Sequence, residues 1–264
     1  LEQSDLSFTA SGGSSVRRSV LPSGVRILTE QVPGAQSVSV SFSVAVGSRD
    51  ETNNHFGSTH FLEHLLFKGT KKRTAMDIAV AFDSVGGSSN ASTGKEHTSY
   101  YAKVSDKALP IAVDVIADML TSSLIDETEF ENERPVILEE LAMNDDDPQD
   151  VVHEAFSTAV LGDHPLGRPI GGTVETITAV SRDAVWEHYQ NNYRPQDLVV
   201  AAAGAVDHQE LIQLVEKGLS EAGWDLGLAA KPVPRRILNP TKISRGSKLH
   251  VIHRPISQVN ILVG

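Results

Sequence analysis

Strict alternation between serine and apolar residues in one segment restricts the fold of this chain more than any other feature. Between Gln36 and Val46, serines and apolar residues take turns along most of the segment. Successive side chains of a β-strand point to opposite faces, so the apolar set lies on one face and the serines lie on the other. The pattern therefore predicts a half-buried strand, and the rest of the chain is interpreted around a sheet.

The other elements follow one another in a mixed order. Two strands flank the turn Pro22-Ser23-Gly24, which predicts a hairpin. Strands are expected at residues 15–21, 25–29, 36–46, 88–94, 97–104 and 198–203, and helices at 58–67, 74–85, 106–120, 126–143, 149–160, 182–191 and 207–219. Ser58 or Thr59 is expected to cap the first helix. This order is typical of an α+β fold, in which helices cover a mainly antiparallel sheet.

The distribution of prolines, glycines and strand patterns predicts four regions. They are a disordered lead at 1–14, a main domain at 15–221, a linker at 222–245 and the beginning of a truncated second domain at 246–264. Two strand-like runs, Lys248–His253 and Gln258–Val263, follow the linker. The second run stops at Gly264 in the middle of its pattern, so we expect the chain to be a fragment of a longer polypeptide.

Composition excludes several classes of function. The formal net charge is −11, which disfavours binding to nucleic acids and anionic lipids. No apolar run approaches the ~18 residues that a membrane helix needs. The chain has no cysteine, which excludes disulfides and thiolate ligands and is compatible with a cytoplasmic protein. We expect no nucleic-acid or membrane partner, and any metal must be held by histidines and carboxylates.

A five-residue motif on the helix expected at 58–67 carries the strongest chemical signal. At about 100° per residue, His60, Glu63 and His64 fall on one face of this helix. Two histidines four residues apart can hold one metal ion, and the glutamate between them can reach water on that ion. This is the HxxEH pattern of inverted zincins. The helix is otherwise mostly apolar and is expected to be buried, where polar side chains need partners such as a metal.

A catalytic zinc site needs a third protein ligand and one open position. The helix expected at 126–143 offers six glutamates: Glu127, Glu129, Glu131, Glu133, Glu139 and Glu140. Their spacing alone does not choose among them, although Glu133 and Glu140 are two turns apart and therefore share one side. Pro135 lies in the same helix and is expected either to bend it at Glu131–Arg134 or to fall in a first turn.

Three segments resemble one known family of peptidases. They are HFLEHLLFKGT at 60–70, VGGSSNASTGKEHTSYYAKV at 85–104 and ENERPVILEELAMNDDDP at 131–148. In combination they are similar to the catalytic half of the pitrilysin and mitochondrial processing peptidase family, and most similar to its bacterial processing-peptidase-like members. The resemblance covers residues 16–219, and the start of the family's second half follows residue 246.

The resemblance implies a zinc metalloendopeptidase. It implies that His60, His64 and Glu140 bind one Zn²⁺ and that Glu63 is the general base. It also implies that Glu133 supports the metal site from the outer shell, a role that is common for carboxylates beside metal-binding histidines. On this basis the main domain is expected to be catalytic.

The resemblance also predicts where a substrate binds. It implies that Ser88–Gly94 is an edge strand to which an extended peptide or unfolded protein adds as a further strand. Asn90, Ala91 and Ser92 are then expected to lie closest to the substrate. Phe61 is expected either near the cleaved bond or packed in the core. Family members enclose the substrate between two homologous halves and form dimers. The second half of the same polypeptide and a dimer partner are therefore expected.

Two alternative functions compete with this interpretation. The first is a non-catalytic scaffold or substrate-recognition subunit of the same family, and the second is a module that only sequesters metal. The expected location is cytoplasmic and of bacterial type.

The resemblance also implies that the family's second half contributes side chains to the site. A chain without that half can therefore bind zinc and still be inactive.

Overall fold

Seven strands and eight α-helices form the part of the chain that the computed structural model describes, residues 5–233 and 246–264. The strands are β1 (Leu6–Thr9), β2 (Ser15–Val20), β3 (Arg26–Gln31), β4 (Ser37–Val44), β5 (Ser88–Thr93), β6 (Thr98–Ser105) and β7 (Leu198–Gly204). The helices are α1 (Ser58–Leu65), α2 (Ala75–Asp83), α3 (Leu109–Ser122), α4 (Glu127–Asp146), α5 (Pro148–Leu161), α6 (Val174–Ala179), α7 (Arg182–Asn192) and α8 (His208–Glu221). Within these described ranges, no helix combines the length and apolar character needed to cross a lipid bilayer.

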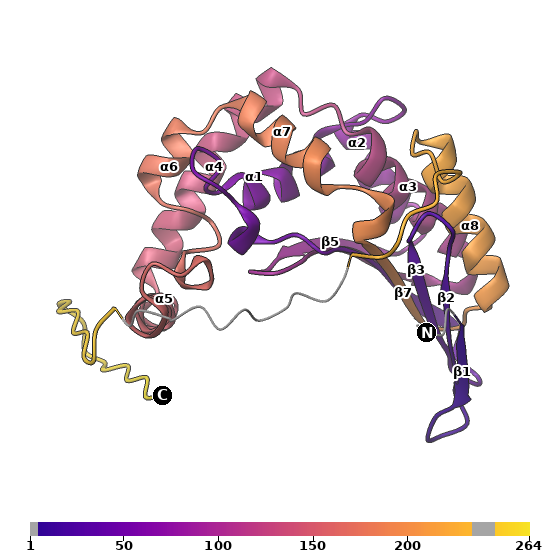
Figure 1. Cartoon of the computed structure of the whole chain (residues 1–264), viewed down its shortest axis with the longest axis horizontal. Helices are drawn as coiled ribbons and strands as arrows, with labels where there is room; N and C mark the ends of the chain where they lie inside the picture. The colour runs from indigo at the N-terminus through magenta and orange to yellow at the C-terminus, as the bar shows by residue number, and fades with distance from the viewer. Residues whose placement is uncertain (1–4, 234–245) are drawn as a thin grey trace.

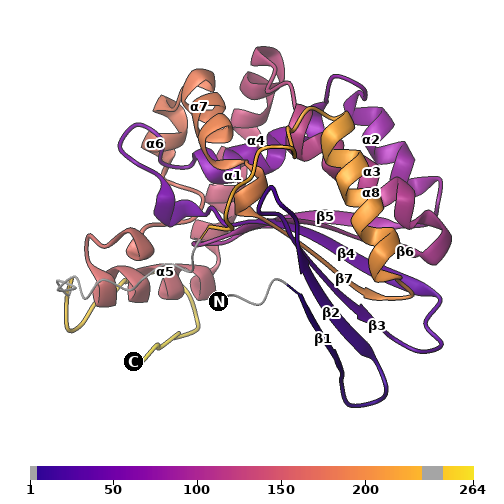
Figure 2. The same ribbon diagram turned by 45° about the vertical axis from the view of Figure 1, so that its right-hand side comes forward.

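All seven strands belong to one sheet, in the order β1-β2-β3-β7-β4-β6-β5. Neighbouring strands run antiparallel except β3 and β7, which are parallel. Helices α1, α2, α3 and α8 lie together on one face of the sheet (Figures 1 and 2). The predicted α+β fold with a mainly antiparallel sheet is therefore confirmed, as is the predicted hairpin, which is formed by β2 and β3.

Strand β4 lies inside the sheet and has the alternation that its sequence predicts. Val38, Val40, Phe42 and Val44 are at most 1% exposed and belong to the core beneath the helices. The serines between them point to the opposite face. Strand β6, which pairs with β4, also alternates, and Tyr100 at its centre is 1% exposed. One buried sheet face therefore supports the helical layer.

Helix α1 is surrounded by α4, α7 and strand β5. Its side chains Phe61, Leu62 and Leu65 are at most 1% exposed. Phe61 stacks on Phe130 of α4, with ring centroids 4.3 Å apart. Because a close-packed interior resists displacement, the side chains that α1 presents on its remaining face are held in fixed positions.

The structure differs from the sequence prediction at the N-terminal end. Leu6–Thr9, within the segment expected to be disordered, forms β1 and pairs antiparallel with β2. All four residues of β1 are exposed, so no buried face marked this strand in the sequence. Residues 1–4 lie outside the described residues.

The short helix α6 was also not predicted, although Thr173 caps it by accepting a hydrogen bond from the Thr176 backbone N–H.

The strands expected at Lys248–His253 and Gln258–Val263 do not form. Described residues 246–264 contain no strand, and apolar side chains such as Leu249 and Val263 are 79% and 89% exposed. A strand requires a hydrogen-bonded neighbour, and no described strand pairs with this segment. Part of the expected linker, residues 234–245, lies outside the described residues, and residues 222–233 contain no helix or strand.

Candidate metal centre

Helix α1 begins without a side-chain cap of its own. Its N-cap residue is Gly57, with φ at +89°, so neither Ser58 nor Thr59 has the predicted capping role. The carboxylate of Glu51 replaces that cap: it accepts hydrogen bonds from the backbone N–H groups of Gly57 at 2.9 Å and Thr59 at 2.8 Å. These contacts satisfy N–H groups that a helix start leaves open. Burial raises the pKa of Glu51, against the opposing effect of these hydrogen bonds.

A buried histidine also contacts this end of α1. His188 on α7 is 4% exposed, and its Nε2 lies 3.1 Å from Thr59 Oγ1. Burial lowers the pKa of His188 to about 4, with a further contribution from the charge of His55. His188 is therefore neutral near pH 7, and it links α7 to the first turn of α1.

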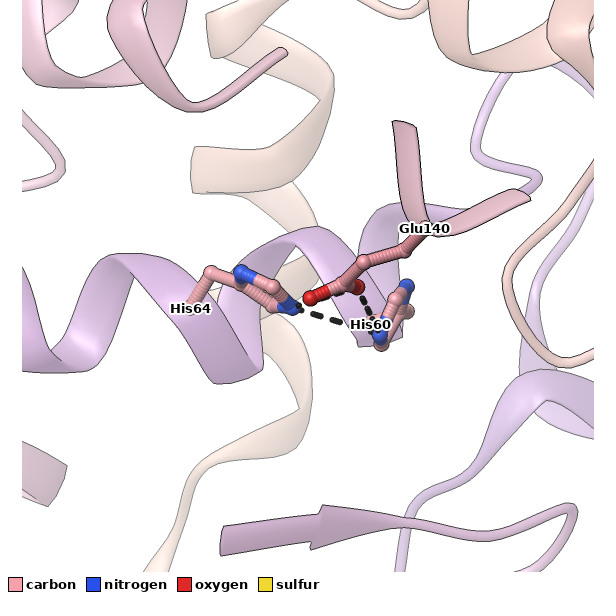
Figure 3. Close-up of side chains that lie close together, drawn as sticks. All are labelled: His60, His64 and Glu140. Atoms are coloured by element: carbon pink, nitrogen blue, oxygen red, sulfur yellow. Dashed lines mark hydrogen bonds and ion pairs between the residues drawn. The ribbon is translucent and has the colours of Figure 1, made fainter. Parts of the chain in front are cut away.

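His60 directly follows Thr59 and His64 lies one turn later, and their imidazoles converge with a carboxylate. His60 Nε2 and His64 Nε2 are 3.3 Å apart, and Glu140 Oε2 lies 3.6 Å from the first and 3.4 Å from the second (Figure 3). A tetrahedral zinc ion with ligand distances of about 2.0–2.2 Å separates its ligand atoms by about 3.3–3.6 Å. The three measured separations match this range, so the donor set fits zinc in both chemistry and spacing.

Glu140 comes from helix α4, which crosses α1 at this point (Figure 3). Within residues 5–233 and 246–264, the group of possible metal ligands that converges is His60, His64 and Glu140. Pro135 lies inside α4, beyond its first turn, so the expected place in a first turn is wrong, while the helix itself continues through the proline. Pro135 and Glu131 both lie on the exposed side, where water can replace the hydrogen bond that proline removes.

Glu133, two turns before Glu140, holds the second histidine from behind. Its Oε1 lies 2.9 Å from His64 Nδ1, which leaves His64 Nε2 directed at Glu140. Its Oε2 forms an ion pair of 2.6 Å with Lys68 Nζ. Burial raises the pKa of Glu133, but the hydrogen bonds from Lys68 and His64 outweigh burial and lower it. A carboxylate behind a metal-binding imidazole fixes both the tautomer and the ring orientation.

His60 lacks such a carboxylate. Its Nδ1 is buried and has no hydrogen-bond partner among the described residues. Gly171, in the loop before α6, lies against this ring: a Cβ added at Gly171 would lie 3.5 Å from His60 Nδ1 and 2.9 Å from Leu141 Cδ2. Burial, followed by the charge of His64, lowers the pKa of His60 to about 4. The imidazole is thus neutral near pH 7, the form that binds metal.

Glu63 lies on α1 between the two histidines and outside the converging trio. Thr93, at the end of β5, donates a hydrogen bond from Oγ1 to Glu63 Oε2. Burial is the largest influence on Glu63 and raises its pKa; the charge of Glu140 adds to this, while Thr93 and His64 oppose it. A carboxylate whose pKa is shifted toward neutrality is suited to accept and return a proton.

Strand β5 is an edge of the sheet, as the sequence predicted for this segment. Gly94 donates a backbone hydrogen bond to His97 O, which sets the alternation of the β5–β6 ladder. The backbone N–H and C=O groups of Ala91 and Thr93 therefore point toward the open edge. The Ala91 N–H donates a hydrogen bond of 2.8 Å to Oδ1 of the neighbouring Asn90 side chain. Asn90 and Ser92 are exposed, on the sheet face opposite Ala91.

The structure does not support a substrate-binding role for Phe61. Its side chain is 0% exposed and packs on Phe130, so it belongs to the core that positions α1. Several residues that support the site were not predicted from the sequence, namely Glu51, Lys68, Thr93, Gly171 and His188. Lys68 alone carried a local signal, because it lies four residues after His64 and therefore near it on a helix.

Comparison with known proteins identifies the family. The family described as Insulinase (Peptidase family M16) matches residues 26–174, and that described as Peptidase M16 inactive domain matches residues 179–264. The chain belongs to peptidase family M16. Together with the sheet and helices described above, this places the HxxEH helix in the matched part of the M16 chain.

Individual relatives agree with this assignment. An uncharacterized zinc protease of Streptomyces coelicolor is 47% identical over 253 residues, covering 96% of this chain and 55% of that protein. The β subunit of the mitochondrial-processing peptidase of Saccharomyces cerevisiae is 38% identical, covering 83% of this chain and 48% of the subunit. The crystal structure of a protease from Helicobacter pylori superposes with a TM-score of 0.74 at 25% identity, covering 87% of this M16 chain and 53% of that structure.

The M16 chain spans about half the length of the relatives it matches. Relatives carry the name zinc protease, which associates zinc with the family. The converging trio of His60, His64 and Glu140 supplies donors of the type that zinc prefers.

Proposed function

We propose that this chain is the zinc-binding part of an M16 metalloendopeptidase that cleaves extended peptides. The observation that carries the proposal is the spacing of His60 Nε2, His64 Nε2 and Glu140 Oε2, which matches the edges of a tetrahedral zinc site. The contact between His64 and Glu133 adds the outer-shell carboxylate that such sites use. The three side chains are only partly exposed, so their polar atoms have limited access to water and a shared metal ion would give them a common partner.

The chemistry of the proposed reaction is amide hydrolysis. Bound zinc would act as a Lewis acid that acidifies water and polarises a carbonyl oxygen. Glu63 accepts the proton of the attacking water and passes it to the nitrogen of the leaving amine. Thr93 orients the Glu63 carboxylate through its hydrogen bond. The raised pKa of Glu63, caused mainly by burial, brings this group closer to the range in which it can both take and give a proton.

The proposed substrate site is the open edge of β5. A peptide that adds to this edge bonds the outward backbone groups of Ala91 and Thr93, which leads it past Glu63. The Ala91 N–H donates a hydrogen bond to the side-chain oxygen of Asn90. When a substrate binds, its carbonyl oxygen would replace Asn90 as the acceptor. Ser92 lies on the sheet face opposite Ala91, and its small side chain lets another backbone approach the edge. Specificity at this edge therefore comes from the backbone more than from these side chains.

The partners in this proposal are those that the family resemblance implies. They are a peptide or unfolded-protein substrate, a second homologous half from the same polypeptide, and a second copy in a dimer. Nucleic acids and membranes are not partners in the proposal, since the net charge of −11 opposes binding to anionic polymers and lipids. A cytoplasmic location in a bacterial cell is also part of this proposal.

The direct test is Glu63→Gln in the full-length polypeptide, assayed with an unstructured fluorogenic peptide library and for bound zinc. We expect zinc to stay stoichiometric while turnover falls by at least about 10²-fold, because general acid–base catalysis contributes ~10²–10⁴-fold. Glu139→Gln, an exposed glutamate next to Glu140, is the matched control and should leave both unchanged. Substantial cleavage by zinc-loaded Glu63→Gln would reject the role of Glu63. Stoichiometric zinc without any cleavage by the unmodified protein would favour the non-catalytic alternative.

A further inference from the structure

Lys68 connects the proposed metal centre to the segment that follows α1. It is the last residue of the short turn η2 (Leu66–Lys68), one helical turn after His64. Its Nζ atom lies 2.6 Å from Glu133 Oε2, while the other oxygen of the same carboxylate, Oε1, lies 2.9 Å from His64 Nδ1. The two oxygens of Glu133 are thus divided between a lysine and a histidine.

We propose that Lys68 is a positioning residue of the zinc centre. By holding Glu133 Oε2, it fixes the plane of the carboxylate so that Oε1 remains the acceptor for His64 Nδ1–H and His64 presents Nε2 to the metal. This inference rests on the proposed function of the site. Within residues 5–233 and 246–264, the ion pair of Lys68 is with Glu133 and no hydrogen bond or ion pair joins Lys68 to His60, His64 or Glu140, so its effect on the metal passes through Glu133.

The need for a second anchor follows from the geometry of a carboxylate. The terminal torsion of a glutamate has broad minima, so one hydrogen bond leaves the carboxylate free to rotate about that contact. Glu133 contacts His64 and Lys68, and its side chain is 7% exposed, so water has little access to replace a missing partner. Removal of Lys68 leaves a buried carboxylate with a single hydrogen-bond partner, His64, an arrangement that favours rearrangement of the carboxylate.

The backbone that carries Lys68 is fixed on its far side. Thr70 donates a hydrogen bond of 2.6 Å to Asp118 Oδ2, and Arg73 forms an ion pair of 2.7 Å with the same oxygen. Asp118 is 0% exposed on α3. Lys68 therefore lies between the buried helix α1 and a buried ionic cluster, and its ammonium group reaches Glu133 from a rigid backbone.

The test is zinc affinity, measured by chelator competition at about pH 7.5 on the full-length protein. We expect Lys68→Met to weaken zinc binding by about tenfold, within the ~10–100-fold range for outer-shell changes. Lys68→Arg, which keeps the charge and donors, should restore most of the affinity. Lys72→Met, an exposed lysine in the following loop, is the matched control and should bind zinc like the unmodified protein.

A double variant separates positioning from a general structural role. If Lys68 acts through Glu133, then Lys68→Met combined with Glu133→Gln binds zinc no more weakly than Glu133→Gln alone. Additive losses in the double variant, or unchanged affinity in Lys68→Met, would overturn the inference. If Lys68→Met does not fold, Lys68→Gln is measured in its place with the same expected loss. Failure of the unmodified protein itself to bind zinc would instead reject the proposed function, and this inference with it.

Discussion

The two ends of helix α1 are held in place by different kinds of interaction. At the end that carries His60, the contacts are directed at the helix itself: Glu51 accepts backbone N–H bonds, and His188 contacts Thr59. The ring of His60 has no hydrogen bond at Nδ1 and is confined by packing. At the other end, the ring of His64 is bonded directly by Glu133.

This difference shows that one helix can position two proposed ligands by two kinds of interaction. His60 is positioned by the contacts at the start of the helix and by the neighbouring loop that carries Gly171, whereas His64 is positioned by a charged hydrogen-bond chain. Packing and hydrogen bonding fail under different conditions, since close packing responds to added volume and ion pairs respond to loss of charge. Substitutions and pH can therefore address the two ends separately.

The largest effect on zinc binding is expected from removal of either histidine, and it should be the same at both ends of α1. His60→Ala and His64→Ala each remove one of the three protein ligands that a catalytic zinc site needs. Both variants should lose stoichiometric zinc, as measured by metal analysis after gel filtration. His97→Ala, an exposed histidine in the β5–β6 turn, should retain it. Retention of full zinc occupancy by either ligand variant would show that its imidazole is not a ligand.

The next largest effect should be confined to the His64 end. Glu133→Gln replaces the anionic acceptor at His64 Nδ1 by a neutral amide and also removes the ion pair with Lys68. We expect zinc affinity to fall by about 10–100-fold, measured by chelator competition. Glu51→Gln, at the opposite end of α1, should change zinc affinity much less because its hydrogen bonds go to Gly57 and Thr59 and not to a proposed ligand. Equal losses in both variants would remove the distinction between the two ends.

Acid should act on the His60 end through His188. Burial lowers the pKa of this group from 6.5 to about 4, so between these values the unfolded chain binds a proton that the folded chain does not. The contribution of neutral His188 to the free energy of unfolding is therefore fully present above about pH 6.5 and is lost as the pH falls toward 4. Between about pH 7 and pH 5, we expect His188 to account for about 2 kcal/mol of lost stability.

Urea unfolding of the unmodified protein and of His188→Gln at both pH values measures this contribution. Glutamine keeps a hydrogen-bonding side chain but does not titrate in this range. The difference in unfolding free energy between pH 7 and pH 5 should therefore be smaller in the variant. An identical pH dependence of the two proteins would mean that His188 does not couple acid to the start of α1.

The smallest effect is expected from added volume beside His60. Gly171→Ala introduces a methyl group that would lie 2.9 Å from Leu141 Cδ2 and 3.5 Å from His60 Nδ1. The short contact meets the flexible end of Leu141 and the distance to His60 is an ordinary van der Waals contact, so zinc affinity should fall by only about twofold by chelator competition. Gly227→Ala, whose Cβ would meet only the flexible Asp225 side chain, is the control. A Gly171→Ala protein with unchanged zinc affinity would show that packing does not restrain His60.

The sequence predicted the parts of this molecule that have a local period or motif. The alternation in Gln36–Val46 gave the half-buried strand β4, and the HxxEH spacing placed His60 and His64 on one helical face. Spacing alone did not distinguish Glu140 from the other glutamates of α4. That choice depends on how α4 crosses α1, which is a tertiary property.

Contacts between segments that are distant in the chain could not be predicted from the sequence for the same reason. Glu51 replaces the expected cap of α1, and Gly171 lies against His60, although both are separated from the motif by loops. The family resemblance allowed Phe61 a place near the cleaved bond or in the core, and its 0% exposure puts it in the core. Strand β1 was missed because an exposed strand at a sheet edge has no apolar period.

The central claim is that two imidazoles and the carboxylate of Glu140 hold one zinc ion. X-ray diffraction from crystals of the zinc-loaded full-length protein, recorded on both sides of the zinc absorption edge, tests it most directly. We expect one anomalous peak within about 2.0–2.2 Å of His60 Nε2, His64 Nε2 and a Glu140 oxygen. A fully loaded protein in which the Glu140 carboxylate lies away from the peak, or in which the peak lies away from both histidines, would contradict it.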